Sequence, residues 1–511
     1  MNNVGTPALA SAFQRGQAMV MVVIFTAVLV ICLLLVFSVG QVTTTKTKLQ
    51  NTADNVAYSV ALVQARDYNF SAYTNRAMVL NQVAAAHALG VVSWTRYSQA
   101  TFNRSSIGGN VAYLESIGAW AGGQSGWRTP WDRLVRQVRN FRSVENAFSA
   151  LLRLIAPVID GLGSAQVAYH LATITTVAEI MGLPPGGPGN LVRENDPRAR
   201  VSSYGIAMQL NNARDWNNFT GNFEPTRNRD SPGNPGQERL AHVTMDTFKS
   251  FDAFHRLRIP APPYLTPLVP WDSSASLGGV AHMSLWHGGG TELSKDKRSW
   301  VAMDVAGAMV VVMVNTVLFG VWPIPHPVPL DYGSAMFGTG GNHSPTNKFG
   351  KNYATAFSGT FLNPWTAAEG GLAQLDSPRQ IARLPLKDRG GLRDYRDVKD
   401  VTNESARPTA AFVVEVERPM ASVSTAATAP FNINGPRLGL STQAASGCLR
   451  AIAAAEPYFS RPNDLWRRAD RKTERGNLFS PYWQARLTAT PLLVRTGSQA
   501  AQVAAAGPTR C

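Results

Sequence analysis

The feature that most constrains this chain is an uninterrupted apolar run near its amino terminus. Residues 18–39 read AMVMVVIFTAVLVICLLLVFSV and contain no charged residue, proline or glycine. As a helix that rises about 1.5 Å per residue, this run spans a hydrocarbon core of about 30 Å. Fifteen of its residues are Val, Leu, Ile or Phe, and together they favour insertion by about 5 to 9 kcal/mol. The sequence therefore predicts a transmembrane helix over residues 17–40 that anchors the protein in a lipid bilayer.

A cleaved secretory signal is the alternative interpretation of this run. The apolar region of such a signal is shorter, about 7–15 residues, and only a weak small-x-small site follows the run here. Permanent anchoring is therefore favoured. Arg15 before the run and Lys46 and Lys48 after it leave the positive-inside rule nearly balanced. A short tail of residues 1–16 is easily retained in the cytoplasm while the remainder is exported, and we expect that orientation.

Residues 41–105 contain no proline and predict one helix that continues the span. Apolar and small side chains recur at intervals of three or four, which places them on one helical face. Polar residues Asp67, Thr74 and Asn81 occupy alternate positions, so the far end of this seam is partly polar. Two roles stay open and are compatible: the stripe packs on its own domain, or it contacts neighbouring subunits. The stripe comprises Leu49, Ala53, Val56, Val60, Val63, Phe70, Ala77 and Ala84.

Downstream of this helix the pattern stays helical up to a clear break. A second helical stretch is predicted over residues 131–182, with Gly161 and Gly163 as kinks. The string GLPPGGPGN then predicts a linker. Two shorter helices are expected near residues 200–216 and 237–256.

Beyond these helices the pattern becomes β-rich. Residues 301–322 and 411–418 are rich in β-branched side chains, which predicts strands. The first segment approaches a membrane span in length, so a second span is the alternative. It contains Asp304, Gly307 and Asn315, and these residues favour two buried strands joined by a bend.

These patterns together predict an α+β protein: a single transmembrane helix that continues into a long helix, a helical region, and a β-rich exported domain. We expect the following parts along the chain: a cytoplasmic tail (1–16), the transmembrane helix (17–40), a helical stalk or hairpin (41–183), a Pro/Gly-rich linker (184–200), a mixed α+β extracytoplasmic domain (201–497) and a flexible tail (498–511).

The chain contains only three cysteines, which limits the disulfides that it can form. Cys32 lies within the apolar run. Cys448 and Cys511 are the pair that can form a disulfide, which would close a loop of about 60 residues and contribute about 4 kcal/mol in an oxidising periplasm. Because Cys511 is the last residue, whether the two pair stays open.

The net charge of +15 favours anionic neighbours such as lipid headgroups or cell-wall polymers. The positive residues are spread along the chain, which disfavours a nucleic-acid partner. The densest basic cluster, between Arg461 and Arg475, is interleaved with acidic residues. That pattern favours a solvated, self-paired helix face over a groove for polyanions.

The motifs of common active sites are missing or broken. Eight histidines are scattered without the spacing of a zinc site, and His282 and His287 near Asp272 are best read as part of a polar loop. Residues 272–276 match the D-x-S-x-S pattern of a metal-dependent adhesion site, but prolines precede them where a buried strand is needed. Residues 346–352 only partly match a phosphate loop. We therefore expect no catalytic residue, metal, cofactor or small-molecule substrate, and no enzymatic activity.

Several stretches together resemble one family. RGQA precedes the apolar run, and LQNTADNVAYS and AYTNRAMVLNQ follow it. SWVAMD and VPLDYGSA stand in the middle of the chain, and PYFSRP and GNLFSPYWQARL stand near its end. Over most of its length the chain is similar to the TadE/TadG-like proteins of Flp (tight-adherence) and related type IV pilus systems.

This resemblance implies a membrane-tethered pilus assembly factor or minor pilin-like subunit in the bacterial inner membrane, with its folded part in the periplasm. Its partners would be other pilin-like or pilus-assembly membrane proteins. Gly16 resembles a prepilin-peptidase junction with the cut before Gln17. Met21 stands where processed pilins carry glutamate, and this departure favours an uncleaved anchor. The alternative function is an envelope-anchored adhesin or binding module that holds anionic surface polymers.

Overall fold

The computed structural model describes most of the chain as two compact units. The described residues are 12–102, 141–183, 190–227, 233–251, 257–258, 279–294, 296–316, 320–338, 390–399, 411–424, 447–461 and 476–504. The predicted α+β class is confirmed, with a long apolar helix first and a β-rich part after it. Neither unit is one continuous segment: unit 1 comprises Met1–Phe70, Ala168–Thr220 and Thr402–Cys511, and unit 2 comprises Ser71–Val167 and Gly221–Val401. The domain boundaries expected from the sequence stay predictions.

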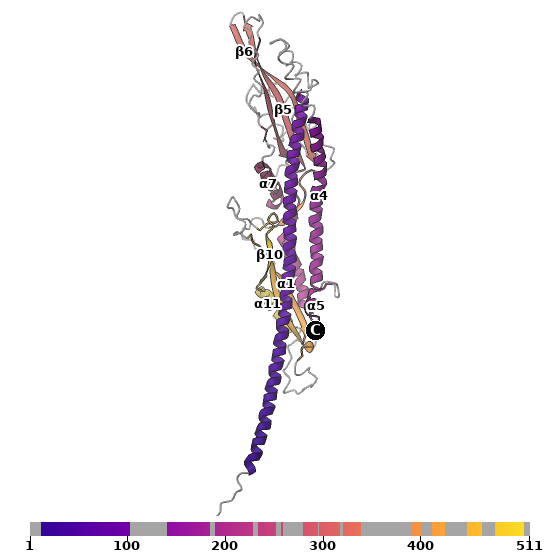
Figure 1. Cartoon of the computed structure of the whole chain (residues 1–511), viewed down its shortest axis with the longest axis vertical. Coiled ribbons are helices and arrows are strands. Elements are labelled where there is room, and N and C mark those ends of the chain that lie inside the picture. The colour runs from indigo at the N-terminus through magenta and orange to yellow at the C-terminus, as the bar shows by residue number, and fades with distance from the viewer. Residues whose placement is uncertain are drawn as a thin grey trace, which may run out of the picture. The chain divides into compact units, whose positions relative to one another are not determined.

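Helix α1 (Ala12–Phe102) is one α-helix of 91 residues, and Figure 1 shows it without a break. It joins the predicted span to the predicted helix that follows it. Within the span, the Thr26 hydroxyl donates to the Val22 carbonyl at 2.7 Å, so this polar group is satisfied inside the helix. By length and composition, α1 and α4 (Phe141–Ile180) are the two helices among the described residues that are able to cross a membrane.

Unit 1 is built on a four-stranded antiparallel sheet in the order β1-β8-β9-β10. Its central strand β8 confirms the strand predicted over residues 411–418. The helices α5, α6 and α11 accompany this sheet. The bounds are β1 (Arg200–Val201), β8 (Phe412–Pro419), β9 (Cys448–Phe459), β10 (Trp483–Thr488), α5 (Leu191–Asn195), α6 (Ser203–Phe219) and α11 (Leu492–Ala504), with a 3-10 turn at Met420–Ser422.

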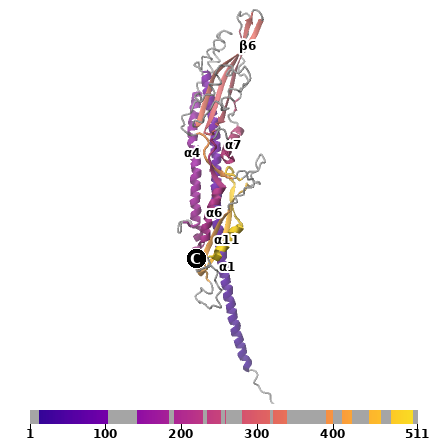
Figure 2. The same ribbon diagram turned by 180° about the vertical axis from the view of Figure 1, so that it is seen from behind.

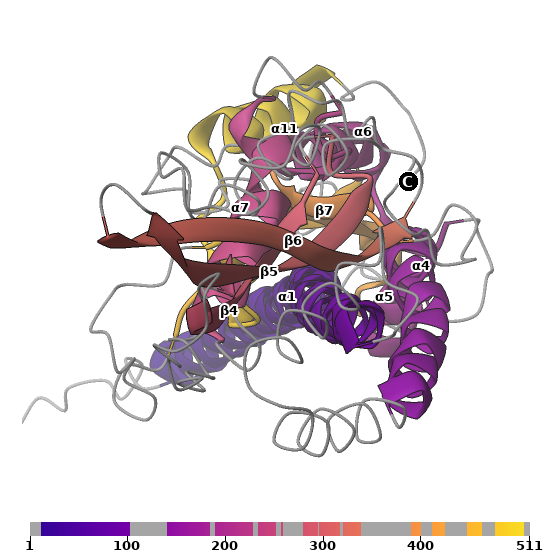
Figure 3. The same cartoon turned by 90° about the horizontal axis from the view of Figure 1, so that it is seen from above.

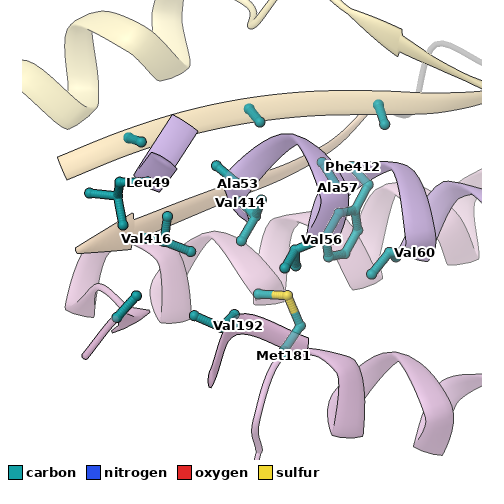
Figure 4. Close-up of a cluster of buried hydrophobic side chains, with 14 of the residues drawn as sticks. Leu49, Ala53, Val56, Ala57, Val60, Met181, Val192, Phe412, Val414 and Val416 are labelled. Atoms are coloured by element: carbon teal, nitrogen blue, oxygen red, sulfur yellow. The ribbon is translucent and has the colours of Figure 1, made fainter. Parts of the chain in front are cut away.

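The core of unit 1 forms where α1 packs on β8 and β9. Small residues in α1 let the helix approach the sheet closely, and alternate residues of β8 point toward it. Figure 4 shows the labelled side chains of the two elements facing one another. Each of these side chains is at most 4% exposed. The cluster includes Leu49, Ala53, Val56, Ala57 and Val60 of α1, Phe412, Val414 and Val416 of β8, and Ala451, Ala453 and Ala455 of β9.

The opposite face of β8 is acidic and holds the C-terminal helix. Glu415 is 1% exposed, and its carboxylate accepts hydrogen bonds from Ser202 at 2.7 Å and from Ser498 of α11. The Tyr204 hydroxyl of α6 donates to the Val494 carbonyl of α11 at 3.0 Å, and Figure 2 shows the two helices side by side. Residues 498–504 of the expected tail lie in helix α11, and the flexible tail itself stays a prediction. Alanine-rich sequence is a strong helix former, and Ser498 fixes this helix to β8.

Unit 2 contains a second antiparallel sheet in the order β3-β4-β5-β6, and β2 pairs with β7 in a sheet of two strands. Strands β5 and β6 form a long hairpin in which Thr316 pairs with Gly320. This hairpin confirms strands rather than a second membrane span over residues 301–322. The bounds are β2 (Thr220–Phe223), β3 (Leu257–Arg258), β4 (Gly279–Leu293), β5 (Ser299–Thr316), β6 (Gly320–Gly338), β7 (Tyr395–Val398) and α7 (Pro235–Ser250).

The remaining helices begin where the sequence provides caps. Ser202 caps α6 through the Gly205 amide, and Asn234 with Gln237 forms a capping box at the start of α7. Both helices confirm the predictions near residues 200–216 and 237–256. Helix α4 continues through the two glycines expected to kink it, and residues 131–140 of its predicted length lie outside the described residues. Helix α5 and the first residue of β1 lie in the second half of the predicted linker over residues 184–200, and the bounds of this linker stay a prediction.

A close approach in unit 2 requires glycine at position 333 of β6. A Cβ atom built on Gly333 would lie 2.1 Å from the Tyr97 backbone nitrogen and 2.3 Å from the Ser93 carbonyl oxygen of α1. Because these are backbone atoms, they cannot relieve the clash by a change of rotamer. Figure 3 shows β4, β5 and β6 with α1 against them.

We predict that Gly333→Ala destabilises the protein by about 1–3 kcal/mol, because the methyl group overpacks a contact between two backbones. Gly161→Ala is the matched control, since a Cβ at this exposed helical position meets no atom within 4 Å. There alanine should stabilise by about 0.5–1 kcal/mol. Chemical denaturation followed by circular dichroism measures both. Equal midpoints for Gly333→Ala and wild type would contradict the packing of β6 on α1.

Candidate interaction site on the first helix

The first part of α1 presents a largely exposed apolar surface among the described residues. The 18-residue window of highest hydropathy in this helix has none of its residues buried. Phe25 and Val36 are each 69% exposed. A long, exposed apolar surface on a protein marks a site that a membrane or another protein covers. This finding is consistent with a membrane anchor. Cys32 in this segment carries a free thiol.

The predicted stripe lies partly inside the protein. Leu49, Ala53, Val56 and Val60 have no exposed area and belong to the core of unit 1. Val63, Phe70 and Ala77 are half-buried, and Ala84 is exposed. The packing alternative thus accounts for the first four residues. A contact of the stripe with neighbouring subunits stays a prediction.

Polar side chains of α1 attach the helix to the backbone of unit 1. Asn69 makes two bonds to one residue: its amide nitrogen donates to the Trp483 carbonyl at 2.9 Å, and its amide oxygen accepts from the Trp483 N–H at 3.0 Å. Gln50 donates to the Ile452 carbonyl at 3.0 Å. Lys46 donates to the Arg450 carbonyl, and burial lowers the pKa of its ammonium while Glu415 partly opposes that shift. Side chains at positions 46, 50 and 69 of α1 therefore bond this helix to strands β9 and β10.

A buried carboxylate marks the point in unit 1 where α1 meets α4. Asp67 is 0% exposed, and its carboxylate lies 2.9 Å from Nδ1 of His170. The His170 ring in turn stands edge-on to the ring of Trp216 in α6, with 5.3 Å between the centroids. A carboxylate in this position fixes the orientation of the imidazole.

In unit 2 the polar side chains of α1 bind both the sheet and α4. Gln82 donates to the Gly391 carbonyl at 2.9 Å and accepts from the indole N–H of Trp300 at 2.7 Å. Ser93 donates to the buried carboxylate of Asp304 at 2.6 Å. Burial raises the pKa of the Tyr97 phenol, and the nearby Asp304 raises it further. This phenol therefore stays neutral throughout the physiological pH range.

The side-chain amide of Gln166 in unit 2 joins α4 to α1 and β7. Gln166 of α4 donates to Asn75 Oδ1 at 2.6 Å and to Thr74 Oγ1 at 2.7 Å. Its own amide oxygen accepts from the Arg396 N–H at 3.2 Å. The Asn75 amide donates to the Arg396 carbonyl at 2.8 Å. Thr74 and Asn75, like Asp67, stand on the buried side of α1 and serve as hydrogen-bonding groups of the interior.

Each unit also contains a cavity lined by described residues. In unit 2, a cavity of about 530 Å³ is lined by the charged residues Asp160, Arg227, Arg393 and Asp394 among others. Arg393 pairs with Asp160 at 2.6 Å, and burial raises the pKa of the Asp394 carboxyl, with Glu224 adding to the shift. In unit 1, a mainly apolar cavity of about 240 Å³ lies among α1, α4, α6 and β8.

The other residues singled out from the sequence are placed as follows. Gly16 and Gln17 lie in the first turns of α1, and the processing junction stays a prediction. Cys448 at the start of β9 is disulfide-bonded, whereas Cys511 lies outside the described residues, so the pairing of these two stays a prediction.

His282 and His287 lie on β4. Asp272, residues 272–276, 346–352 and most of the basic cluster lie outside the described residues.

No group of three or more His, Cys, Asp or Glu side chains that could hold a metal ion occurs among the described residues. The sequence analysis missed Asn69, Gln82 and Gln166 as structural residues. For Asn69 and Gln82, which lie on α1, the available signal was the recurrence of polar residues on the buried side of this helix, of which it singled out only Asp67, Thr74 and Asn81.

Comparison with known families bears directly on α1. Residues 16–65 match the Tad family model. The description of this family reads "Putative Flp pilus-assembly TadE/G-like". The matched residues, called the Tad segment below, contain the exposed apolar part of α1 and the residues that pack on β8. The match confirms the resemblance over residues 16–65 and suggests involvement in Flp pilus assembly. No curated protein and no solved structure matches the chain.

Within the Tad segment, the string LQNTADNVAYS has a direct structural explanation. Its apolar and small residues Leu49, Ala53, Val56 and Ala57 face the sheet, and Gln50 bonds to β9. The string is thus a docking surface for the helix within its own unit.

We predict that Asn69→Ala destabilises the protein by about 2 kcal/mol, because it leaves the N–H and C=O of Trp483 without their partner. Asn51→Ala is the matched control, since Asn51 is an exposed α1 residue and its substitution should change stability by less than about 0.5 kcal/mol. Thermal unfolding of the purified full chain compares the two variants. The anchoring of β10 to α1 is refuted if both behave as wild type.

Proposed function

We propose that this chain is a single-pass, membrane-anchored structural or assembly factor of a Flp/Tad or related type IV pilus system. In this proposal the bulk of the chain is periplasmic, the protein is minor pilin-like, and it performs no catalysis. The observation that carries the proposal is the match of the Tad segment on a helix whose most apolar 18-residue window contains no buried residue.

The continuity of α1 supports a structural role. The helix passes from the exposed apolar part directly into the core of unit 1, where Leu49 is fully buried. A helix of this kind transmits position and orientation from the bilayer to the folded unit, as an assembly factor must. The buried polar groups described above are engaged in holding α1, which is a structural use of hydrogen bonds.

The proposed orientation is tested by protease added to spheroplasts that express the chain with an epitope tag at its C-terminus. We predict that protease removes the tag from intact spheroplasts and leaves a short cytoplasmic tail protected. A tag that is cleaved only after the membrane is permeabilised would place the bulk of the chain in the cytoplasm and overturn this part of the proposal.

The proposed role in assembly is tested in a strain that lacks the gene. We predict loss of surface fibres and their restoration by the wild-type chain. A variant in which residues 1–40 are replaced by a cleavable secretory signal should be exported and folded but should not restore fibres, because it is no longer anchored. Electron microscopy counts fibres per cell. Full restoration by the released variant would refute the need for an anchor.

The alternative function, an adhesin for anionic surface polymers, is favoured by the net charge of +15. The same strain separates the two functions. An adhesin predicts normal fibres in the mutant but weaker adhesion that falls further with added salt, since exposed charges more than about 10 Å apart are screened at 0.1 M.

A further inference from the structure

Two hydrogen bonds of α1 fix which end of the sheet in unit 1 lies nearer the apolar run. Lys46 donates to the Arg450 carbonyl, and Gln50 donates to the Ile452 carbonyl at 3.0 Å. Residue numbers therefore rise away from the apolar run along both α1 and β9. Because β8 pairs antiparallel with β9, the last residues of β8 and the first residues of β9 form the edge of the sheet that lies toward the anchor.

One row of charged residues crosses the sheet at this edge. Arg200 of β1 pairs with Glu417 of β8, which pairs with Arg450 of β9. Since Lys46 bonds to Arg450, the row lies level with Lys46, about 10 Å along the helix from Val39. The headgroup region of a bilayer extends about 5–8 Å beyond each side of the hydrocarbon core. With Val39 at the end of the core, the row lies just outside the headgroups.

The exposed charged side chains of this edge are all basic. The described residues that form the edge are 41–50, 196–201, 415–424 and 447–450. Within these ranges the exposed charged side chains, called the basic edge below, are those of Lys46, Lys48, Arg198 and Arg200. The guanidinium of Arg198 donates to the Ser422 carbonyl at 2.9 Å, which places it beside the turn that follows β8. The Arg200 side chain is 55% exposed.

The carboxylates of this edge are buried and bonded to neighbours. Glu417 lies 3.0 Å from the guanidinium of Arg200 and 3.2 Å from that of Arg450, so two cations share one anion. Asp196 pairs with Arg418 at 2.8 Å. Both carboxylates are at most 4% exposed.

The remaining members of the basic edge lack an ion-pair partner. No ion pair joins Lys46, Lys48 or Arg198 to a carboxylate within the part of unit 1 that the structure describes. Glu415 attracts Lys46, but it is 1% exposed and does not reach the surface. Helix α5 exposes one arginine and one glutamate, whose charges cancel. The outward charge at this edge is therefore positive.

We propose that the basic edge binds the headgroups of anionic phospholipids in the leaflet from which α1 emerges. An anionic leaflet attracts basic residues near its surface, and each such residue strengthens the attraction about fivefold. The attraction acts over a Debye length of about 8–10 Å at 0.1–0.15 M salt, and the long side chains of Lys and Arg bring their charges within this range. The inference rests on the proposed function, because it requires the anchor to lie in a bilayer.

The basic edge combines two elements, and this combination gives the contact a direction. Lys46 and Lys48 belong to α1, whereas Arg198 and Arg200 belong to the border of the sheet. Headgroups that bind both pairs favour the rotation and tilt of the span that bring the sheet border to the leaflet. The basic edge thus orients unit 1 on the membrane.

The first test measures the lipid preference of the full-length chain reconstituted in phosphatidylcholine vesicles. Electron paramagnetic resonance with spin-labelled phosphatidylglycerol and spin-labelled phosphatidylcholine gives the association constant of each lipid with the protein. We expect Lys48→Gln combined with Arg198→Gln to lower the preference for phosphatidylglycerol about fivefold at about 0.1 M salt. At about 1 M salt, where the Debye length is about 3 Å, variant and wild type should not differ. An equal preference in both at the lower salt concentration would overturn the proposal.

Two further double variants serve as controls. Arg66→Gln with Arg214→Gln removes two exposed cations of unit 1 outside the basic edge, and Arg66 lies about 30 Å farther along α1 than Lys46. This variant should leave the preference unchanged, and a fall equal to that of the first variant would refute the edge as the site. Lys48→Arg with Arg198→Lys keeps both charges and should keep the preference. Loss of the preference in this conservative variant would show that charge is not responsible and would also overturn the proposal.

A photocrosslinking amino acid tests whether the edge touches lipid. Ala421, which is exposed in the turn after β8, is the test position. Asn218, exposed on α6, is the control, because its neighbour Phe219 contacts Tyr68 far along α1. In vesicles that contain phosphatidylglycerol, mass spectrometry should find a lipid adduct at position 421 only. No adduct there, or equal adducts at both positions, contradicts the proposal.

Soluble polyphosphate distinguishes lipid from polymeric anions. At a phosphate concentration equal to that of the phosphatidylglycerol, it should leave the adduct in place, because lipid held beside the anchor has the higher effective concentration. Loss of the adduct would assign the edge to soluble polyanions and overturn the proposal. A chain that is not recovered with the vesicles refutes the anchor of the proposed function, whereas a vesicle-bound chain without lipid preference refutes this inference alone.

Discussion

The rest of the structure depends on burying α1, whose inward side carries amides and a carboxylate as well as methyl groups. A buried donor or acceptor without a partner costs about 1–3 kcal/mol, so this helix is stable in the interior only where the surrounding strands satisfy its polar side chains. Asn69 achieves this with both backbone groups of one β10 residue. The Gln82 amide donates to the Gly391 carbonyl and accepts from the indole N–H of Trp300. The positions of β9, β10 and the strands of unit 2 are specified by these bonds as much as by apolar contact.

The same hydrogen bonds explain which parts of the fold could be predicted from sequence. The apolar run, the proline-free helix after it and strands such as β8 follow from local composition and periodicity, and all are present. The amide contacts join residues that are far apart in the chain: Gln50 and Ile452 are separated by 402 positions, and a single sequence carries no signal for such pairing.

The helical segment in the expected C-terminal tail was missed for a related reason. An Ala/Gly-rich end looks flexible until the burial of Ser498 against Glu415 is known. In the candidate site, the exposed apolar segment was predictable from composition. The apolar cavity of unit 1 was not, because Gln64, Trp216 and Phe412, which line it, come from three separate stretches of chain.

Long-range contacts of this kind also constrain the order of folding. Helix α1 is synthesised first, and its partner strands β9 and β10 are synthesised near the end of the chain. The polar side chains on the inward side of α1 therefore have no strand to bond to until then. Loop closure over hundreds of residues is entropically slow. A truncation before residue 483 would remove Trp483 and leave the Asn69 amide without the two backbone groups that it binds.

The seven-residue interval between the end of the apolar run at Val39 and Lys46 has a mechanical consequence. It is helical throughout and is only about 10 Å long. In the proposed membrane-anchored state, unit 1 would therefore stay close to the bilayer, and a change in the tilt of the span would change the direction in which the sheet of unit 1 points. Lipid thickness, which influences that tilt, would then influence the orientation of the folded unit.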